Sequence, residues 1–174
     1  MVGKKMNVIL YMAQTPNGFI ATREDDTSFV TDAEWKHFRK MIGKSDAIVV
    51  GRRTYEMMRE NRETIPNVLM VVLTRNPSHF RKEDDVLFTN KKPREIVFQM
   101  KKMGFSNVLI AGGGILNAHF LKDKLVNEMY LDIEPLMLGH GIPLVSAHDF
   151  KLKLKLLGIK KFHANGVQLH YRVV

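Results

Sequence analysis

Short apolar runs alternate along the chain with segments whose apolar residues recur at helical spacing. Continuous apolar runs such as Asn7–Met12 and Asp46–Val50 are typical of strands that are buried on both faces. Together with the turn residues between them, such runs predict strands over Asn7–Met12, Phe19–Ala21, Asp46–Val50, Val68–Thr74, Val86–Thr89, Asn107–Ala111 and Glu128–Glu134. Because strands of this kind need cover on both sides, the pattern favours a sheet between two layers of helices.

Helices are predicted between these strands. One of them has a single apolar face, made of Trp35, Phe38, Met41 and Ile42. Thr31 or Asp32 can cap it, and Gly43 ends it. Glu34 stands at the spacing of a capping box with Thr31, which gives it a structural role as the first interpretation. The other predicted helices run from Gly51 to about Glu60, over Pro93–Met103, and from the glycines at 112–114 to about Lys122.

The last part of the chain has a different pattern. Leu138–Pro143 is predicted to be a loop, and leucines at 152, 154 and 156 alternate with lysines, as in a strand with one buried and one wet face. Asn165-Gly166 between two extended runs is a strong hairpin signal. The chain is therefore predicted to form one domain over residues 1–174, a three-layer α/β/α fold whose mainly parallel sheet ends in an antiparallel C-terminal hairpin.

Composition narrows the class of protein. The 174 residues include no cysteine, which excludes disulfides and thiolate metal sites and suits a reducing cytoplasm. Met6–Ala13 is too short to cross a bilayer or to act as a secretory signal, so no membrane association is expected. The seven histidines show no convincing metal-ligand spacing, and no metal is predicted.

The net charge of +9 admits several partners. A basic surface attracts nucleic acid, anionic lipid or small dianions, although exposed lysines can also serve only solubility. Aromatic residues are not interleaved with the basic ones, as a stacking platform for nucleic acid would require. Nucleic acid is therefore the less favoured partner.

The segment Val108–Leu121 points to a phosphate-bearing ligand. An apolar strand runs into Gly112, Gly113 and Gly114, and a helix follows at once. Such a turn brings backbone close to a ligand, and the helix start offers unpaired N–H groups. Two other strand ends, at Gly51–Thr54 and at Thr74-Arg75, add hydroxyls and guanidinium groups.

Parallel strands place their carboxyl ends at one edge, so the three turns are expected to grip a nucleotide together. The plain alternative is that each is only a tight turn with surface arginines. Asn117 stands where the common dinucleotide fingerprint has its third glycine, and no P-loop signature is present.

The motifs in these segments resemble those of a known family. The segments Met12–Ala21, Ser45–Tyr55, Leu73–Pro77 and Val108–Leu144 occur in the order found in the dihydrofolate reductase-like superfamily. The likeness is closest to the reductase domain of riboflavin biosynthesis, the C-terminal domain of the bifunctional deaminase–reductase, and to its stand-alone relatives.

The resemblance implies a cytoplasmic, homodimeric, NADPH-dependent reductase that acts on a small heterocyclic substrate. By it, the diphosphate lies against Gly51, Arg52, Arg53 and Thr54. Thr74 and Arg75 hold the 2′-phosphate. The diphosphate and the nicotinamide ribose pack against Gly112, Gly113, Gly114, Ile115 and Leu116. The nicotinamide faces Ala13, Gly18 and Ile20.

The substrate side departs from the family pattern. The first loop has Asn17-Gly18-Phe19, where riboflavin-type reductases usually carry Asp-Gly-Lys. True dihydrofolate reductases hold the pterin with a carboxylate of the first helix, for which Glu34 is the nearest candidate. The expected catalytic residues are Glu34 and Asp32, and the expected substrate contacts are Asn17, Phe19, Trp35 and Asp132.

Three functions stay open at this point. The first is reduction of the ribosylamino-pyrimidine phosphate of riboflavin synthesis, as by 5-amino-6-(5-phosphoribosylamino)uracil reductase. The second is reduction of dihydrofolate or another pterin. The third is binding of a nucleotide or nucleic acid without turnover.

Overall fold

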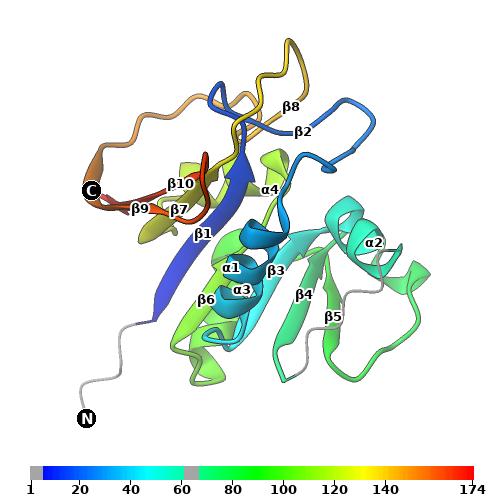
Figure 1. Cartoon of the computed structure of the whole chain (residues 1–174). Helices are drawn as coiled ribbons and strands as arrows, with labels where there is room; N and C mark the ends of the chain where they lie inside the picture. Colours follow the sequence, from blue (N-terminus) through cyan, green and yellow to red (C-terminus); the bar gives the residue numbers. More distant parts are fainter. Residues whose placement is uncertain (1–5, 61–66) are drawn as a thin grey trace.

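One twisted sheet of eight strands forms the centre of the molecule (Figure 1). The computed structural model describes residues 6–60 and 67–174. The sheet order is β5-β4-β3-β6-β1-β7-β10-β9, and β2 pairs with β8 in a separate two-stranded sheet. The strands are β1 Asn7–Gln14, β2 Phe19–Ala21, β3 Ala47–Gly51, β4 Leu69–Leu73, β5 Val86–Thr89, β6 Asn107–Ile110, β7 Glu128–Ile133, β8 Ile142–Pro143, β9 Leu154–Lys161 and β10 Val167–Val173. The helices are α1 Asp32–Ile42, α2 Arg52–Glu60, α3 Pro93–Lys102 and α4 Gly114–Lys122, with a 3₁₀ turn at Pro77–His79.

The six strands from β5 to β7 in this order are parallel. β10 is antiparallel both to β7 and to β9. The predicted fold class, with a mainly parallel sheet and an antiparallel C-terminal hairpin, is thus confirmed. We call the edge at which the parallel strands end the carboxyl edge.

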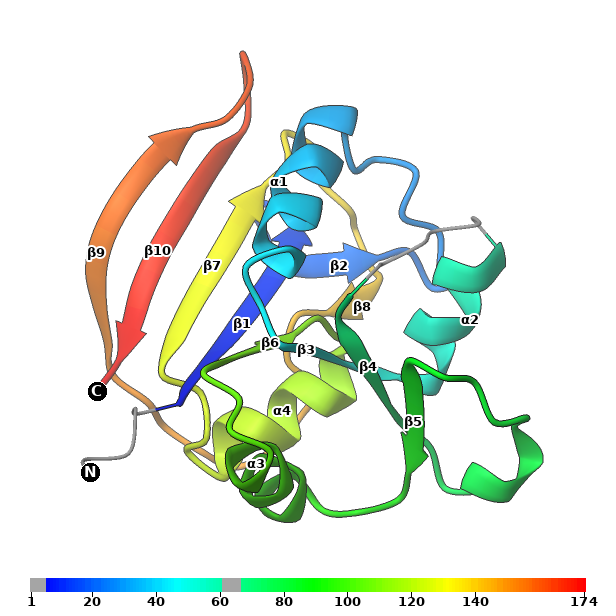
Figure 2. The ribbon, with the colours of Figure 1, turned by 90° about the horizontal axis from the view of Figure 1, so that it is seen from below.

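Helices cover both faces of the sheet (Figure 2). α1 and α2 contribute Phe38, Ile42, Tyr55 and Met58 to the core on one face. α3 and α4 contribute Ile96, Met100, Leu116, Phe120 and Leu121 to the core on the other. The continuous apolar strands follow from this arrangement, because side chains that point either way are buried. Each fully buried Leu, Ile or Val contributes about 1.5–3 kcal/mol.

Alternation along β1 sorts its side chains between the two cores. Val8 and Leu10 point toward α3 and α4, whereas Ile9 and Tyr11 point toward α1 and α2. By the same alternation Ala13 lies on the α1 face, at the carboxyl edge.

Two sequence predictions about the C-terminal part are wrong. Ile142 and Pro143, predicted as loop, form β8, because β2 is close enough to pair with them. The strand of alternating leucines begins only at Leu154, and neither of its faces is buried: Leu154 is 44% exposed and Leu156 is 47% exposed. β9 is the last strand of the sheet, and none of its residues belongs to the two cores of the described part of the chain.

The β2–β8 pair holds the first loop in place over the carboxyl edge. Gly141 packs so closely that an added Cβ would overlap the carbonyl oxygen of Ala21 and would lie 3.3 Å from the ring of Phe19. The backbone N–H of Leu144 donates to the carbonyl of Gly18 at 2.8 Å. The loop between β1 and β2 is therefore supported from behind by the loop after β7.

Candidate functional site

The three strand ends singled out in the sequence meet at the carboxyl edge. β4, β3 and β6 are neighbours in the sheet and run in the same direction, so their ends at Leu73, Gly51 and Ile110 lie side by side. The backbone N–H of Gly51 donates to the carbonyl of Gly112 at 2.8 Å, which joins two of the turns directly. Gly112 has a φ of 91°, a conformation for which glycine is suited.

Two helices begin at these turns, α2 after Gly51 and α4 after Gly113. Neither has an acidic residue in its first turn, and no side chain caps α4 at Gly113. The space around Gly113 is open, since an added Cβ would meet nothing within 4 Å. Gly114 by contrast is packed against the Pro143 carbonyl, and its own carbonyl accepts from the Ser146 N–H at 3.1 Å. The edge thus presents two positive helix ends around an open cradle.

The arginines at this edge differ in their surroundings. Arg52 makes a bidentate contact with Glu56 at 2.8 Å to both oxygens, and Arg53 lies 3.7 Å from a carboxylate oxygen of Asp25. Both are exposed, as is Arg75 at the end of β4. Exposed pairs of this kind are weak, so Arg52 and Arg53 can turn toward an anion at little cost.

The remaining residues expected to bind the cofactor lie along the same edge. Thr54 and Thr74 are half-buried, Ile20 and Leu116 are buried, and Ile115 is 65% exposed.

The end of β1 continues the edge beyond β6. Ala13 is half-buried, and Thr15 fixes the loop that follows it: its hydroxyl donates to Asn17 Oδ1 at 2.8 Å and accepts from the Phe19 N–H at 3.0 Å. Gly18 has a φ of 85° in this turn. Asn17 itself donates through Nδ2 to the Leu138 carbonyl at 2.6 Å, so its side chain ties two loops together.

Two buried amides near this edge keep unpaired oxygens. Gln14 at the end of β1 and Asn117 in α4 are both buried, and the side-chain oxygen of each has no hydrogen-bond partner in the described part of the chain. Buried polar atoms without partners are uncommon and mark places that a ligand or a water can satisfy.

Buried carboxyls gather beside Ala13, on the α1 face of the sheet. Ala13 pairs in register with Asp132 of β7, and Asp132 pairs with Gln168 of β10. The hydroxyl of Tyr11 donates to Asp132 Oδ2 at 2.6 Å, and Gln168 Nε2 donates to Asp132 Oδ1 at 2.7 Å. Asp132 is fully buried. Its carboxylate is therefore held from two sides.

Glu134, two residues further along β7, is also fully buried. Its Oε1 accepts from the Thr31 N–H at 3.0 Å and from the Thr31 hydroxyl at 2.8 Å. Its Oε2 lies 3.0 Å from His163 Nε2, and His163 Nδ1 accepts from the backbone N–H groups of Asn165 and Gly166. Because Nδ1 accepts these two bonds, Nε2 is the ring nitrogen that donates to Glu134.

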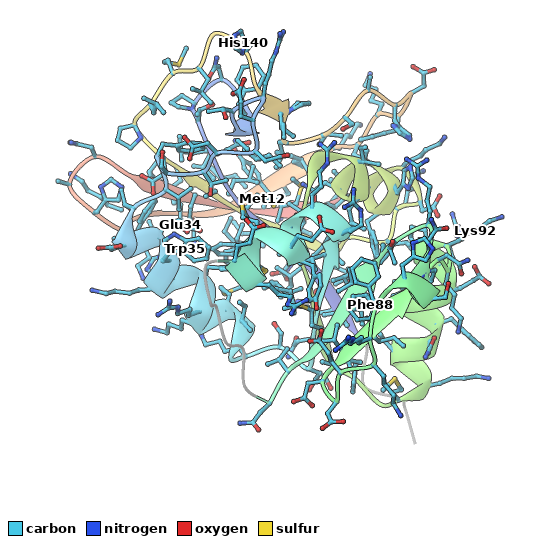
Figure 3. The ribbon with its side chains drawn as sticks, turned by 90° about the vertical axis from the view of Figure 1, so that its right-hand side faces the viewer. Met12, Glu34, Trp35, Phe88, Lys92 and His140 are labelled. Atoms are coloured by element: carbon cyan, nitrogen blue, oxygen red, sulfur yellow. The ribbon has the colours of Figure 1, made fainter. Side chains whose placement is uncertain are left out.

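These bonds overturn the interpretation of Glu34 as a capping-box residue. Thr31 is the N-cap of α1, and its hydroxyl accepts from the Glu34 N–H at 3.3 Å. The second half of the capping box is missing, because the Thr31 N–H donates to Glu134 instead. Glu34 is 3% exposed, and a side-chain hydrogen bond with it is among the causes that raise the pKa of Tyr11. Figure 3 shows Glu34 and Trp35 at the start of α1.

Glu34, Asp132 and Glu134 form what we call the acid cluster. Burial raises the pKa of Asp132, against the hydrogen bonds from Tyr11 and Gln168 that favour its charged form. Burial also raises the pKa of Tyr11, and the neighbouring carboxyls of Glu34 and Asp132 add to the effect. The Tyr11 hydroxyl therefore stays protonated at any physiological pH.

Other expected site residues lie at varying distance from this cluster. Asp32 is exposed on the first turn of α1. Trp35 and Phe19 are half-buried, and the Trp35 ring packs edge-on against Phe38 at 5.7 Å between centroids. His37, which the sequence did not single out, has its Nδ1 3.8 Å from Asp132 Oδ2 and a 24% exposed side chain.

The sequence reasoning also missed Tyr11, Glu134 as a partner of Thr31, and His163. Strand alternation contained a signal for two of them, because Tyr11 and Ala13 share a face of β1, just as Asp132 and Glu134 share a face of β7. His163 lies in the turn between β9 and β10, and no pattern in the sequence predicts its contact with Glu134.

Among the described residues, no helix is long and apolar enough to cross a membrane. Within the same ranges, no group of three or more His, Cys, Asp or Glu side chains is arranged to hold a metal ion.

Comparisons with known proteins give the geometry a context. A family model described as the RibD C-terminal domain matches residues 6–169. The chain is 30% identical over 168 residues to the uncharacterized Bacillus subtilis protein YwjB, covering 94% of this chain and 95% of that one.

Two solved structures show the same fold. A Thermotoga maritima diaminohydroxyphosphoribosylaminopyrimidine deaminase/5-amino-6-(5-phosphoribosylamino)uracil reductase has a TM-score of 0.81 at 18% identity over 98% of this chain and 57% of that one. A dihydrofolate reductase from Enterococcus faecalis, complexed with NADP(H) and RAB-propyl, has a TM-score of 0.73 at 18% identity over 96% of each chain.

Proposed function

Because the chain belongs to the RibD C-terminal domain family, we propose that it is a cytoplasmic, NADPH-dependent reductase of a small heterocyclic substrate. The observation that carries the proposal is a juxtaposition. An open cradle between two acid-free helix starts lies at the same sheet edge as a buried acid cluster. The first suits the phosphates of a dinucleotide, and the second suits proton transfer to a substrate that receives a hydride.

The residues present fit a nicotinamide dinucleotide. The room above Gly113 lets a diphosphate reach the first N–H groups of α4, and Arg52, Arg53 and Thr54 would add donors from α2. Thr74 and Arg75 would hold the 2′-phosphate from the end of β4. When bound, the cofactor supplies the hydride, and the protein supplies orientation and exclusion of water.

The nicotinamide would lie beside Ala13, with Gly18 and Ile20 across from it. The unpaired oxygen of Gln14, one residue further along β1, is a buried acceptor at the same edge of the sheet, on the face opposite to Ala13. An amide group on the cofactor is the kind of donor that would satisfy such an acceptor.

Glu34 is the proton donor in this proposal. Three buried carboxyls lie close together, and repulsion between them favours keeping one protonated. Glu134 accepts three hydrogen bonds and Asp132 accepts two, so the oxygens of both carboxyls already serve as acceptors. The single proton of the Tyr11 hydroxyl goes to Asp132. In this proposal Glu34 is protonated, and its proton would serve the contact with the Tyr11 oxygen.

The substrate proposed first is a ribosylamino-pyrimidine phosphate, in line with the family. It would lie between the first loop, with Asn17 and Phe19, and the start of α1, with Trp35. Reduction of dihydrofolate or another pterin is the second candidate. The burial of Glu34 in the first helix beside Asp132 favours it, because paired carboxyls can accept from the adjacent N–H groups of a pterin.

Cofactor binding tests the proposal first. NADPH and NADH are titrated by fluorescence into the wild type, Arg75→Ala and the control Arg39→Ala, which removes an exposed arginine from the last turn of α1. We expect Arg75→Ala to weaken NADPH binding by about tenfold to a hundredfold, the loss of one charge-assisted hydrogen bond, and to leave NADH unchanged. Unchanged preference for NADPH would remove Arg75 from the site.

Turnover is the second test. NADPH oxidation is followed with dihydrofolate, other pterins and ribosylamino-pyrimidine phosphates, in the wild type and in Glu34→Gln. Removal of a general acid is expected to lower kcat by about a hundredfold or more. Binding of NADPH without oxidation by any of these compounds would favour a binding protein without turnover. Steeply salt-dependent binding of DNA or RNA in place of NADPH would favour the nucleic-acid alternative.

We also propose that the protein is a homodimer. The exposed side chains of Leu154, Leu156 and Ile159 form an apolar stripe along β9 that a second copy can cover. Light scattering after size exclusion should give twice the chain mass for the wild type and the monomer mass for Ile159→Lys.

A further inference from the structure

Tyr11 lies beside the carboxyls of the acid cluster, and proton donation by Glu34 alone does not require it. The Tyr11 hydroxyl donates to Asp132 at 2.6 Å, and a side-chain hydrogen bond with Glu34 is among the causes that raise its pKa. Tyr11 is 1% exposed, and its ring is packed against Phe38 at 5.4 Å between centroids. A buried hydroxyl that lies between two carboxyls can link them in a chain of hydrogen bonds.

The far end of this chain reaches solvent. His37 lies one turn after Glu34 on α1, with its Nδ1 3.8 Å from the Asp132 oxygen that Tyr11 contacts. Its side chain is 24% exposed, whereas those of Glu34 and Asp132 are buried. A distance of 3.8 Å is too long for a direct hydrogen bond, but one water molecule or a small turn of the ring spans it. The order from solvent inward is therefore His37, Asp132, Tyr11, Glu34.

We propose that Tyr11 is a proton relay. Through it, Glu34 regains a proton from solvent by way of His37 and Asp132. The inference rests on the proposed reductase function for its purpose, though not for its geometry. A substrate bound beside Ala13, as proposed above, would cover Glu34 on that side. The acid must then recover its proton through the protein.

The proton balance of one turnover is simple. A hydride adds to the carbon of a C=N or C=O bond, and Glu34 gives its proton to the heteroatom and becomes a carboxylate. Tyr11 then passes its hydroxyl proton to Glu34 while it takes another from Asp132, which has received one from solvent by way of His37. Tyr11 never has to exist as a phenolate. One proton enters from solvent for each hydride transferred.

The relay is tested without substrate, by infrared spectroscopy of the protein alone. We expect the wild type at neutral pH to show the carbonyl stretch of one protonated carboxyl, which Glu34→Gln abolishes. On mixing into D₂O this band shifts as the acid proton exchanges. Tyr11→Phe should move the band and slow its exchange by about tenfold or more, equivalent to a barrier higher by roughly 1.4 kcal/mol.

The chain offers a matched control and a second interruption of the relay. Tyr130→Phe removes a hydroxyl from the same face of the sheet, where Tyr130 stacks on His170 at 4.0 Å, and should leave band and exchange unchanged. Asp132→Asn leaves the Tyr11 ring in place and should slow exchange as Tyr11→Phe does. Thermal unfolding of each variant identifies those that fold.

Several results would overturn the relay. The proposal fails if the band survives in Glu34→Gln, if no protonated carboxyl is present at neutral pH, or if exchange in folded Tyr11→Phe is as fast as in the wild type. With an active substrate, Tyr11→Phe should also lower kcat about tenfold at unchanged KM. An inactive wild type that keeps the exchange pattern would refute the reductase function and leave the relay standing.

Discussion

The packing of Gly141 gives a sharp test of how the first loop is held. In Gly141→Ala the new methyl would overlap the Ala21 carbonyl oxygen, which is backbone and cannot rotate away, and would press on the Phe19 ring at 3.3 Å. Gly139→Ala is the matched control, because it stands two residues earlier in the same loop with nothing within 4 Å of the added carbon. Neither glycine is among those with positive φ. The two substitutions therefore differ in contact, not in backbone strain.

The magnitudes follow from the contacts. Overpacking costs about 1–3 kcal/mol, which for a chain of this size lowers Tm by roughly 2–12 °C. Gly139→Ala should be neutral or should raise stability by about 0.4–1 kcal/mol, because alanine restricts the unfolded chain. Urea unfolding with an unchanged slope would assign the loss to the folded state.

The protein could also avoid the overlap by releasing β8 from β2. Hydrogen exchange at the β2–β8 pair, measured by mass spectrometry, distinguishes this from a global loss, since only peptides that cover residues 19–21 and 141–144 would lose protection. Equal stability and equal protection in Gly141→Ala and Gly139→Ala would refute the packing argument.

Two further predictions concern buried acids and tyrosines. Glu134→Gln should destabilise the fold by about 1–3 kcal/mol in urea unfolding, because the amide nitrogen would face the Nε2–H of a ring fixed in one tautomer by Asn165 and Gly166. Glu128→Gln, at 2.8 Å from His170 Nε2 and partly exposed, should cost less than about 1 kcal/mol, and equal losses would contradict the tautomer assignment. Burial raises the pKa of Tyr55 to about 12, with help from its hydrogen bond to Glu83, so the folded state holds this proton more tightly than the unfolded chain. That contribution to stability is complete below pH 10 and is lost between about pH 10 and 12. The free energy of unfolding should therefore fall less steeply with pH in Tyr55→Phe than in the wild type over this window. Parallel pH dependences would count against the raised pKa.

The sequence predicts the fold well where burial is simple. Continuous apolar runs, such as the one in β3, predict strands that helices cover on both sides, and the structure has them. The pattern of β9 misleads, because alternation of leucine and lysine shows only that two faces differ. It cannot show that β9 is the outermost strand, where the leucine face also lacks cover.

The candidate site also has one part that the sequence predicts and one part that it does not. The turns at Gly51 and Gly112 are local, and the sequence predicts them together with their shared edge. The acid cluster depends on register between distant strands: Tyr11 and Asp132 are 121 residues apart, and Glu34 takes its role from that pair and not from the nearby Thr31. No local spacing carries such information.

The position of β10 has a consequence for how the molecule is made. β10 lies between β7 and β9, and the turn before it carries His163, which completes the bonds of Glu134. A ribosome delivers this hairpin only after every other part of the sheet has emerged. Until the hairpin has been synthesised, one edge of β7 has no neighbouring strand. Asp132 and Glu134 then lack their contacts with Gln168 and His163. A nascent chain can form the cradle at Gly113 well before it can form the acid cluster. The proposed cofactor site is therefore expected to form earlier than the proposed proton-transfer site.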